Sequence, residues 1–327
     1  MLAAAALSAG CGSTASTSGV PRARNVNLVL DFTPNAVHAG IYSALAHHFD
    51  RDEGIRLRVI VPSATTDSIK LLESGRVNFA ILDIHDLAIA RERGANIIGI
   101  MAMVERPLSA VIAAAQIRSP RELQGATVGI TGVPSDTGVL RSIVAGAAGD
   151  PQRVRTVTIG FNAVADLLAG RVAGATAFWS DEGVTLARRH RGFHSFRVDQ
   201  YGAPSYPELV LCATGEMLHR AGVVAGAVVR TLVRGYAFTL NHPAASAGDL
   251  ESLVPGLDRT LVAAQLTALL PALRGPSGAV GELDPARLRS WAVWEARFGL
   301  VTKPPDVATM FDPRFAPAGR SPAHAAQ

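Results

Sequence analysis

The segment from Asp31 to His38 combines a carboxylate, an aromatic ring, a proline, an amide and an imidazole within eight residues. It directly follows the apolar run 26–30, so it lies where a buried strand is expected to end and a helix to begin. Open α/β sheets bind small molecules at this position, outside the carboxyl ends of their strands. Turn chemistry alone would explain the proline and the amide, but the whole set suits a polar, planar ligand. The candidate ligand-binding residues of this segment are Asp31, Phe32, Pro34, Asn35 and His38.

Two further segments place polar side chains directly after a predicted strand. Residues 131–136 have the pattern of a strand end, a turn and a helix start, where backbone N–H groups suit an anionic or carbonyl oxygen. Ser135 and Asp136 are therefore candidate ligand contacts, and the alternative for either is a helix cap. His85 follows the predicted strand 79–82 on the same side of the sheet and is a third candidate. The glycines of the turn match neither a Walker loop nor a dinucleotide fingerprint.

Strand-like apolar runs alternate with helical patterns over the first two thirds of the chain. This alternation predicts right-handed βαβ units, a mainly parallel sheet and the α/β fold class. Gly75-Arg76-Val77 and Gly170-Arg171-Val172 each precede a strand, and this repeat indicates two lobes of similar topology. The predicted strands are 26–30, 57–61, 79–82, 97–103, 110–114, 127–131, 154–159, 174–179, 195–198 and 209–213, and the helices among them are 41–53, 67–74, 134–146 and 163–168.

The last third of the chain is predicted to be helical from the end of the strand 209–213 to about residue 298. Trp291 and Trp294 fall at helical spacing there and are predicted to be core residues rather than a cage for a ligand. The Pro- and Ala-rich tail 313–327 is expected to be disordered.

Residues 1–25 are expected to be a lipoprotein signal followed by a flexible tether. Residues 1–7 form an apolar run too short to span a bilayer. Ser8-Ala9-Gly10-Cys11 then resembles a bacterial lipobox, and a stretch rich in Ser, Thr and Gly follows it. We expect Cys11 to carry lipid and to anchor the protein at the extracytoplasmic face of the bacterial membrane. The alternative is an Ala-rich N-terminus with an incidental cysteine. With Cys11 acylated, Cys212 is the only other thiol, so no intrachain disulfide is expected.

The composition is that of a globular protein large enough for two lobes. The chain has 327 residues, of which 48% are hydrophobic and 18% charged, so extended disorder is not expected. The net charge of +4 is small, and the one dense basic run, residues 188–191, is read as a solvated helix end. Nucleic acid is therefore not an expected partner. The nine histidines are scattered, so no metal site is predicted.

Four segments of the chain together resemble the periplasmic solute-binding lipoproteins that serve ABC importers of thiamine precursors, the formylaminopyrimidine-binding family. The resemblance extends from about residue 26 to residue 311 and implies a two-lobed periplasmic-binding-protein fold of type II, with a ligand cleft between the lobes. The segments that carry it are 30–38, 129–136, 177–183 and 201–209. The implied bounds are 26–108 plus 207–312 for the first lobe and 109–206 for the second.

The resemblance also implies roles for single residues. An aminopyrimidine is flat and edged with nitrogen donors and acceptors, so it needs aromatic faces for stacking and a carboxylate at its rim. Glu182 occupies the position of such an acid, and Asp181 is the alternative. Phe32 and Trp179, one from each lobe, are the stacking candidates, with core packing as the competing interpretation for each. Tyr206 offers a ring and a hydroxyl near the proposed hinge, or serves there as a spacer.

The implied function is a monomeric receptor that captures a thiamine pyrimidine precursor by lobe closure, uses no cofactor, and delivers the solute to an ABC permease. Within the same class, the alternative ligand is another small aromatic or sulfonate solute. In a different class, the alternative is an enzyme that makes hydroxymethylpyrimidine phosphate. The related eukaryotic enzymes carry a reactive histidine near the position of His85, a cysteine-rich motif and a lysine for pyridoxal phosphate. The cysteine motif is absent and Lys70 lies within a predicted helix, so His85 is expected to contact ligand rather than to react.

Overall fold

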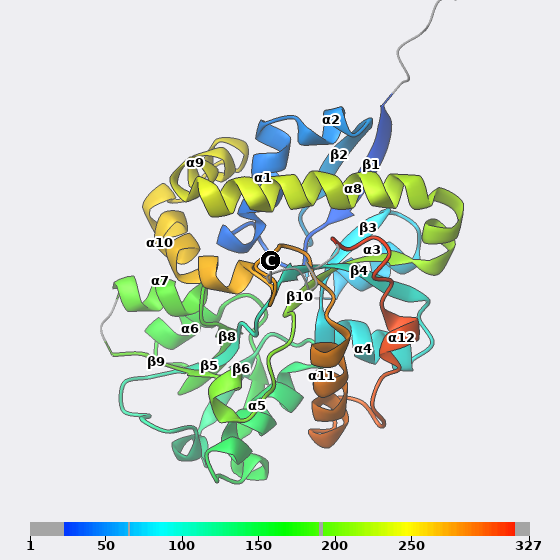
Figure 1. The fold of residues 1–327 in the computed structure, drawn as a ribbon. Coiled ribbons are helices and arrows are strands. Elements are labelled where there is room, and N and C mark those ends of the chain that lie inside the picture. The colour runs from blue at the N-terminus through cyan, green and yellow to red at the C-terminus, as the bar shows by residue number, and fades with distance from the viewer. Residues whose placement is uncertain (1–22, 65, 190–191, 318–327) are drawn as a thin grey trace, which may run out of the picture.

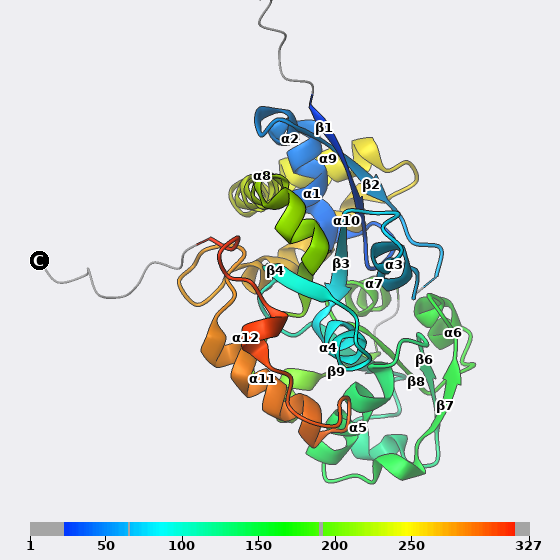
Figure 2. The same ribbon diagram turned by 90° about the vertical axis from the view of Figure 1, so that its right-hand side faces the viewer.

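Two lobes, each built on a five-stranded sheet with helices on its faces, make up the protein (Figures 1 and 2). The structure is a computed structural model and describes residues 23–64, 66–189 and 192–317. The α/β class and the two-lobed architecture expected from the sequence are confirmed.

The first sheet is formed mostly by the N-terminal part of the chain. Its strands are β1 (Arg24–Val29), β2 (Ile55–Ile60), β3 (Phe79–Asp83), β4 (Ile97–Val104) and β10 (Leu209–Thr214), in the order β2-β1-β3-β10-β4. The helices between the N-terminal strands are α1 (Ala39–Ala46), α2 (Phe49–Asp52), α3 (Asp67–Glu73) and α4 (Ile84–Glu92). Helices cover both faces of this sheet, so its central strand β3 is a run of buried residues rather than an alternating one.

The second sheet repeats the strand order of the first, element by element. Its strands are β5 (Ser109–Ala113), β6 (Thr127–Ile130), β7 (Arg155–Thr158), β8 (Gly174–Phe178) and β9 (His194–Arg197), in the order β7-β6-β8-β5-β9. The helices of this lobe include α5 (Asp136–Gly146), α6 (Ala163–Leu168) and α7 (Glu182–Arg189). Gly75 and Gly170 end the helices before β3 and β8 with φ of 69° and 65°, a conformation that favours glycine. The similar topology that the repeat indicated is confirmed.

One strand in each sheet runs against the parallel strands beside it, which differs from the mainly parallel pairing predicted. β10 is antiparallel to β3 and β4, and β5 is antiparallel to β8 and β9. Both strands enter their sheet from the other lobe rather than through a crossover helix, so the βαβ rule does not set their direction. These two crossings support the division that we propose, with 26–108 plus 207–312 as the first lobe and 109–206 as the second.

The C-terminal helices pack mainly on the first lobe. They are α8 (Gly215–Asn241), α9 (Pro243–Leu253), α10 (Arg259–Leu269), α11 (Pro285–Arg297) and α12 (Val307–Met310). α8 lies along α1, and their backbones approach so closely that a Cβ on Gly235 would lie 2.0 Å from the carbonyl oxygen of Gly40. Among the described helices α8 alone is long and apolar enough to cross a membrane, and 56% of its apolar stretch is buried inside the protein.

Trp291 and Trp294 are buried, as predicted, and so is Cys212. The predicted signal and the lipidation candidate Cys11 lie outside the described residues. The described part of the C-terminal tail ends at residue 317, and Phe315 packs there against the core of the first lobe.

Candidate functional site

A cavity of about 120 Å³ lies between the two sheets, where β1, β3, β6 and β8 end. The location agrees with the rule that led the sequence analysis to the carboxyl ends of the strands. Both lobes contribute to its walls, which are largely apolar, so a ligand held there would be shielded from water on both sides. The apolar lining residues are Phe32, Ile69, Ile81, Leu82, Ala110, Val133, Val139, Phe161, Ala177, Phe178 and Leu209.

Aromatic rings from both lobes meet at one side of the cavity. Phe32 follows β1 in the first lobe, Phe161 follows β7 in the second, and their ring centroids are 4.3 Å apart with the planes at 67°. Phe178 at the end of β8 adds a third ring. Phe32 was predicted, whereas Phe161 and Phe178 were not. Phe161 occupies the same strand-end position in the second lobe as Phe32 in the first. The rule that ligands bind outside the carboxyl ends of the strands, which led to Phe32, could therefore also have predicted Phe161.

The polar lining of the cavity is dominated by carboxyl groups. No Lys, Arg or His is among the described residues that line it. A site of this charge suits a ligand rich in hydrogen-bond donors or carrying positive charge, and it disfavours an anion. The six acidic residues are Asp31, Asp83, Asp86, Asp136, Asp181 and Glu182.

Glu182, the predicted carboxylate, lies at the first turn of α7 and lines the cavity. The backbone N–H of Phe178 donates to its Oε2 at 3.0 Å, which fixes the carboxyl at the strand end. Burial, together with repulsion from Asp181, raises the pKa of Glu182 to about 8. Burial also raises the pKa of Asp181 to about 6. Glu182 can therefore act as a protonated donor or as a carboxylate near neutral pH, depending on what lies opposite.

Asp31 also lines the cavity, but His38 does not. The imidazole is fully buried, its Nδ1 accepts from the backbone N–H of Asn35 at 3.2 Å, and its Nε2 lies 2.9 Å from Oδ1 of Asp31. Since Nδ1 accepts, Nε2 carries the proton and donates to the aspartate. The predicted contact between His38 and ligand is thus corrected: both of its nitrogens are used within the protein, and it orients Asp31.

Asn35 connects the two lobes beside the cavity. Its Nδ2 donates to Oδ2 of Asp181 at 2.7 Å, and Nε2 of Gln265 on α10 donates to the other oxygen of the same carboxyl. Asp181 of the second lobe thereby accepts hydrogen bonds from two amide side chains of the first lobe, those of Asn35 and Gln265. Pro34 and Asn35 were predicted to contact ligand, but they do not line this cavity. They line a neighbouring cavity of about 250 Å³, together with Asp181 and Gln265. Asn35 is held by its hydrogen bonds to the protein, so it acts as an interlobe contact.

Asp136 and Ser135, both predicted, line the opposite part of the cavity at the start of α5. Both oxygens of Asp136 are hydrogen-bonded: Oγ1 of Thr131 and the N–H of Gly132 donate to Oδ2 at 2.9 and 2.8 Å, and Oγ1 of Thr176 donates to Oδ1 at 2.8 Å. Burial nevertheless raises its pKa.

Asp83 and Asp86, which the sequence analysis did not select, join Asp136 in this part of the cavity. Asp83 ends β3 and caps α4 by accepting the N–H of His85 at 2.8 Å. Burial raises its pKa well above the usual range. Asp86, in the first turn of α4, has a pKa of about 6, again because of burial.

Trp179 does not face the cavity, so its predicted stacking role is corrected. Its Nε1 donates to the carbonyl oxygen of Pro107 at 3.0 Å, and the guanidinium of Arg197 lies 4.2 Å from its ring centroid. The ring packs beside one of the interlobe crossings. Its neighbour Phe178, the last residue of β8, lines the cavity instead, whereas Trp179 lies in the turn beyond the strand.

His85 and Tyr206 are fully buried and lie outside the cavity lining, which corrects two further predicted contacts. Nε2 of His85 lies 3.0 Å from the hydroxyl of Tyr206, and Nδ1 pairs with Glu295 on α11. The rings of Tyr206, Trp291 and Trp294 surround the imidazole. The paired Glu295 and two nearby carboxylates outweigh desolvation and raise the pKa of His85 to about 10.

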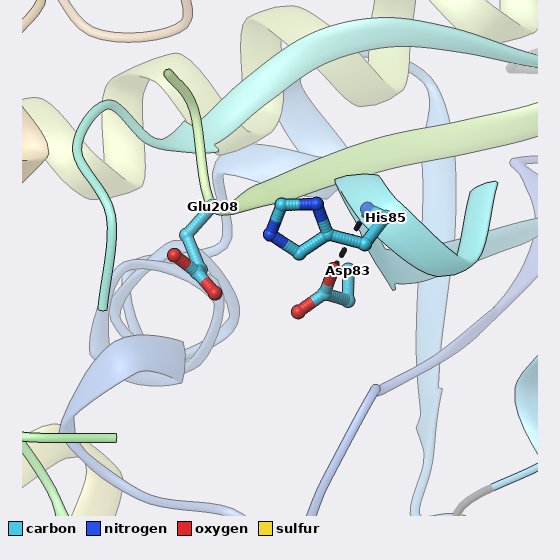
Figure 3. A group of neighbouring side chains, drawn as sticks. All are labelled: Asp83, His85 and Glu208. Carbon is cyan, nitrogen blue, oxygen red and sulfur yellow. Dashed lines mark hydrogen bonds between the residues drawn. The ribbon is translucent and has the colours of Figure 1, made fainter. Parts of the chain in front are cut away.

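The two nearby carboxylates are those of Asp83 and Glu208, which gather around His85 in Figure 3. In the described part of the chain these are the three side chains whose potential metal-binding atoms lie within 4.8 Å of one another. Glu208 accepts from the N–H of Leu108 and the hydroxyl of Ser109, at the crossing between lobes. With its partners supplied by the protein, the group acts as an ionic network that ties β3, α4 and β10 together.

The raised carboxyl pKa values predict that the ligand-free protein becomes less stable as the pH rises from 6 to 8. A native carboxyl with a raised pKa holds its proton at a pH where the unfolded chain has released it, so its contribution falls by about 1.4 kcal/mol per pH unit. For Glu182 this window runs from its usual pKa of 4.5 to about 8. His85 acts in the same direction, since its contribution is fully present below pH 6.5 and lost towards pH 10.

Calorimetric melting at pH 6, 7 and 8 measures this effect, and we expect Tm to fall by several degrees. Glu182→Gln removes one titrating group and should flatten the decline. A Tm that rises over this interval would show that these carboxyls are not buried as described.

The fold is that of the periplasmic binding proteins. A crystal structure of the ligand-binding component of an ABC-type import system from Staphylococcus aureus, with zinc bound, superimposes with a TM-score of 0.71 at 15% identity, covering 89% of this chain and 97% of that one. Within this class the chain belongs to the NMT1/THI5-like family, whose model matches residues 35–246.

Two characterised relatives are similar over most of their length. The formylaminopyrimidine-binding protein of Halalkalibacterium halodurans is 29% identical over 267 residues, which are 79% of this chain and 81% of that protein. The 4-amino-5-hydroxymethyl-2-methylpyrimidine phosphate synthase of Legionella pneumophila is 24% identical over 223 residues, which are 67% of this chain and 70% of that protein. The family resemblance seen in the sequence is confirmed.

Proposed function

We propose that the protein is the solute receptor of an ABC importer and captures an aminopyrimidine precursor of thiamine between its lobes. The observation that carries the proposal is a cavity walled by aromatic rings from both lobes and edged by carboxyls, with no basic side chain among the described residues that line it. A flat heterocycle with amino groups matches both features, since the rings offer faces and the acids accept or share protons at the rim. The similarity to a formylaminopyrimidine-binding protein supports the same ligand class.

Lobe closure is the mechanism of capture in this proposal. Ligand stabilises the closed form only through contacts that the open form lacks, and the cavity supplies such contacts because Phe32 and Phe161 come from different lobes. Asp181, held by Asn35 and Gln265, adds protein contacts that also require closure. A permease that recognises the closed form would then receive loaded protein. Anchoring through Cys11, an extracytoplasmic location and a monomeric state complete the proposal.

The charge of the cavity separates this proposal from a sulfonate-binding function. A sulfonate carries a full negative charge, and burial of an anion requires paired cations or several donors. The lining offers six carboxyls and, among the described residues, no Lys, Arg or His. The enzyme alternative needs a lysine for the Schiff base, and neither Lys70 nor Lys303 lines the cavity.

A ligand panel tests the proposal by thermal shift and titration calorimetry. The panel contains formylaminopyrimidine, hydroxymethylpyrimidine, thiamine, taurine and riboflavin. An aminopyrimidine at one hundred times its Kd should stabilise the protein by about 2.7 kcal/mol, and taurine should leave Tm unchanged. Stabilisation by taurine with no response to any pyrimidine would overturn the proposal. Added pyridoxal phosphate tests the enzyme alternative, which predicts an imine absorbance that is lost in Lys70→Ala.

A further inference from the structure

A turn in the C-terminal part of the first lobe reaches across to the second lobe. It is the turn 298–302, which follows α11, and we call it the α11 turn. The carbonyl oxygen of Phe298 accepts from Nη1 of Arg141 on α5 at 3.0 Å. Leu300 packs on the same helix, so closely that a Cβ on Gly138 would lie 2.4 Å from its Cγ. The end of α11 accordingly lies beside α5 (Figure 2).

The same turn is bound to α4 of the first lobe. The backbone N–H and the hydroxyl of Thr302 both donate to Oε1 of Glu92, at 2.7 and 2.6 Å, and these bonds lower the pKa of that carboxyl. Glu92 is the last residue of α4, where the helix dipole disfavours an acid, so the two donors of Thr302 offset an unfavourable position. The α11 turn therefore joins a helix of the first lobe to a helix of the second.

The two helices that the α11 turn joins each carry part of the cavity wall. Asp86 of α4 and Asp136 of α5 both line the cavity. Repulsion from Asp136 adds to burial in raising the pKa of Asp86, and hydrogen bonding from Ser135 opposes part of this rise. Closure of the lobes brings these two acids together, so their repulsion resists it. The α11 turn offsets this cost from outside, because none of its residues lines the cavity.

We propose that the α11 turn positions α5 against α4 and thereby stabilises the closed form of the cavity. This inference rests on the proposed function and adds to it three positioning residues that do not touch the ligand, Gly138, Leu300 and Thr302. The apparent Kd of every ligand is its intrinsic Kd divided by the fraction of protein in the closed, binding-competent form. A weakened turn therefore raises the Kd of all ligands by the same factor, whereas the loss of a ligand contact affects each ligand according to its chemistry.

Gly138→Val tests the proposal, because the new side chain occupies the space of Leu300 and separates α5 from the turn. If the closed fraction falls to about one fifth, titration calorimetry should show Kd rising about fivefold for both formylaminopyrimidine and hydroxymethylpyrimidine. Small-angle X-ray scattering should give the ligand-free variant a larger radius of gyration than the native protein, and saturating ligand should remove the difference. Ala145→Val, at an exposed position of α5, is the matched control and should leave both measurements unchanged.

Two further variants separate positioning from a general loss of structure. The double variant Gly138→Val with Leu300→Ala removes the overlap and should restore most of the native affinity. Glu92→Ala releases Thr302 and also removes an acid from the end of α4. Its melting temperature should therefore change little, while Kd rises about two- to threefold for both compounds. This variant decides the question on its own if Gly138→Val does not fold.

The outcomes distinguish this inference from the proposed function. Native values of Kd and radius of gyration in the folded variants would overturn the positioning role, and so would a rise in Kd confined to one of the two compounds. If neither compound binds to the native protein, the proposed function fails. The comparison of radii of gyration still tests the α11 turn in that case, because it needs no ligand.

Discussion

Replacing His85 by leucine is expected to lower the free energy of unfolding by about 3–5 kcal/mol, the usual cost of removing one partner from a buried ion pair. The imidazole and the carboxyl of Glu295 are both fully buried and paired with each other. The raised pKa of His85, about 10, indicates that the native state holds the charged form at neutral pH. Without the imidazole, Glu295 is left buried without its cation. Urea unfolding of the native protein and the variant measures the difference.

The double variant His85→Leu with Glu295→Leu is the control for this prediction. Replacing both partners of a buried pair by apolar residues is often neutral or stabilising, so the double variant should recover much of the lost stability. Ligand affinity of the folded His85→Leu protein should be unchanged, since His85 does not line the cavity. If His85→Leu keeps its stability but no longer binds the ligand, His85 is a ligand contact and this prediction is wrong.

The case of His85 shows where sequence reasoning reaches its limit. The rule that strand ends carry binding residues correctly placed this segment at the cavity, and the adjacent Asp83 and Asp86 line it. His85 turns away because Trp291, Trp294 and Glu295, about 200 residues later, form a pocket for it in the core. Local periodicity predicted that both tryptophans are core residues, but it carries no information on which residue they pack against.

A similar limit explains why Trp179 was predicted to line the cavity, whereas Phe178 lines it in the structure. The family motif drew attention to the larger ring, and both residues lie at the strand end that was predicted. Trp179 lies in the turn beyond β8, where its ring packs beside Pro107 and Arg197, and strand periodicity does not predict the direction of a side chain in such a turn. The α4 helix was missed for a related reason: Ile84 to Ala90 are all buried, and a helix buried on every side shows no amphipathic pattern.

Most of the architecture could be predicted from the sequence, because most of the predicted strands are apolar runs bounded by polar turns, and each predicted strand corresponds to a strand of the structure. Five predicted site residues line the cavity: Asp31, Phe32, Ser135, Asp136 and Glu182. They share one property, since each directly follows a strand or begins a helix at the sheet edge. His38 and Tyr206 were predicted to contact ligand, but both bond to other residues of the protein and do not line the cavity.

Glu182→Gln is expected to weaken binding of an aminopyrimidine by about 1.5–3 kcal/mol, the range for a hydrogen bond that involves a charged group. This corresponds to a rise in Kd of about 10- to 150-fold. Glutamine keeps the shape of the side chain and can still accept the N–H of Phe178, which donates to Glu182 in the native protein. The substitution therefore removes the ability to ionise and to exchange a proton with the ligand, and leaves the start of α7 in place.

Titration calorimetry of the native protein and the variant measures the change in Kd, and Glu216→Gln is the matched control. Glu216 is an exposed acid in the first turn of α8, paired with Arg220 and absent from the cavity lining, so this variant should bind with native affinity. The raised pKa of Glu182 adds a second signature: the affinity of the native protein should vary with pH around 8, and that variation should be absent in Glu182→Gln. Equal affinities for the native protein and Glu182→Gln at every pH would remove this carboxyl from the binding of the ligand.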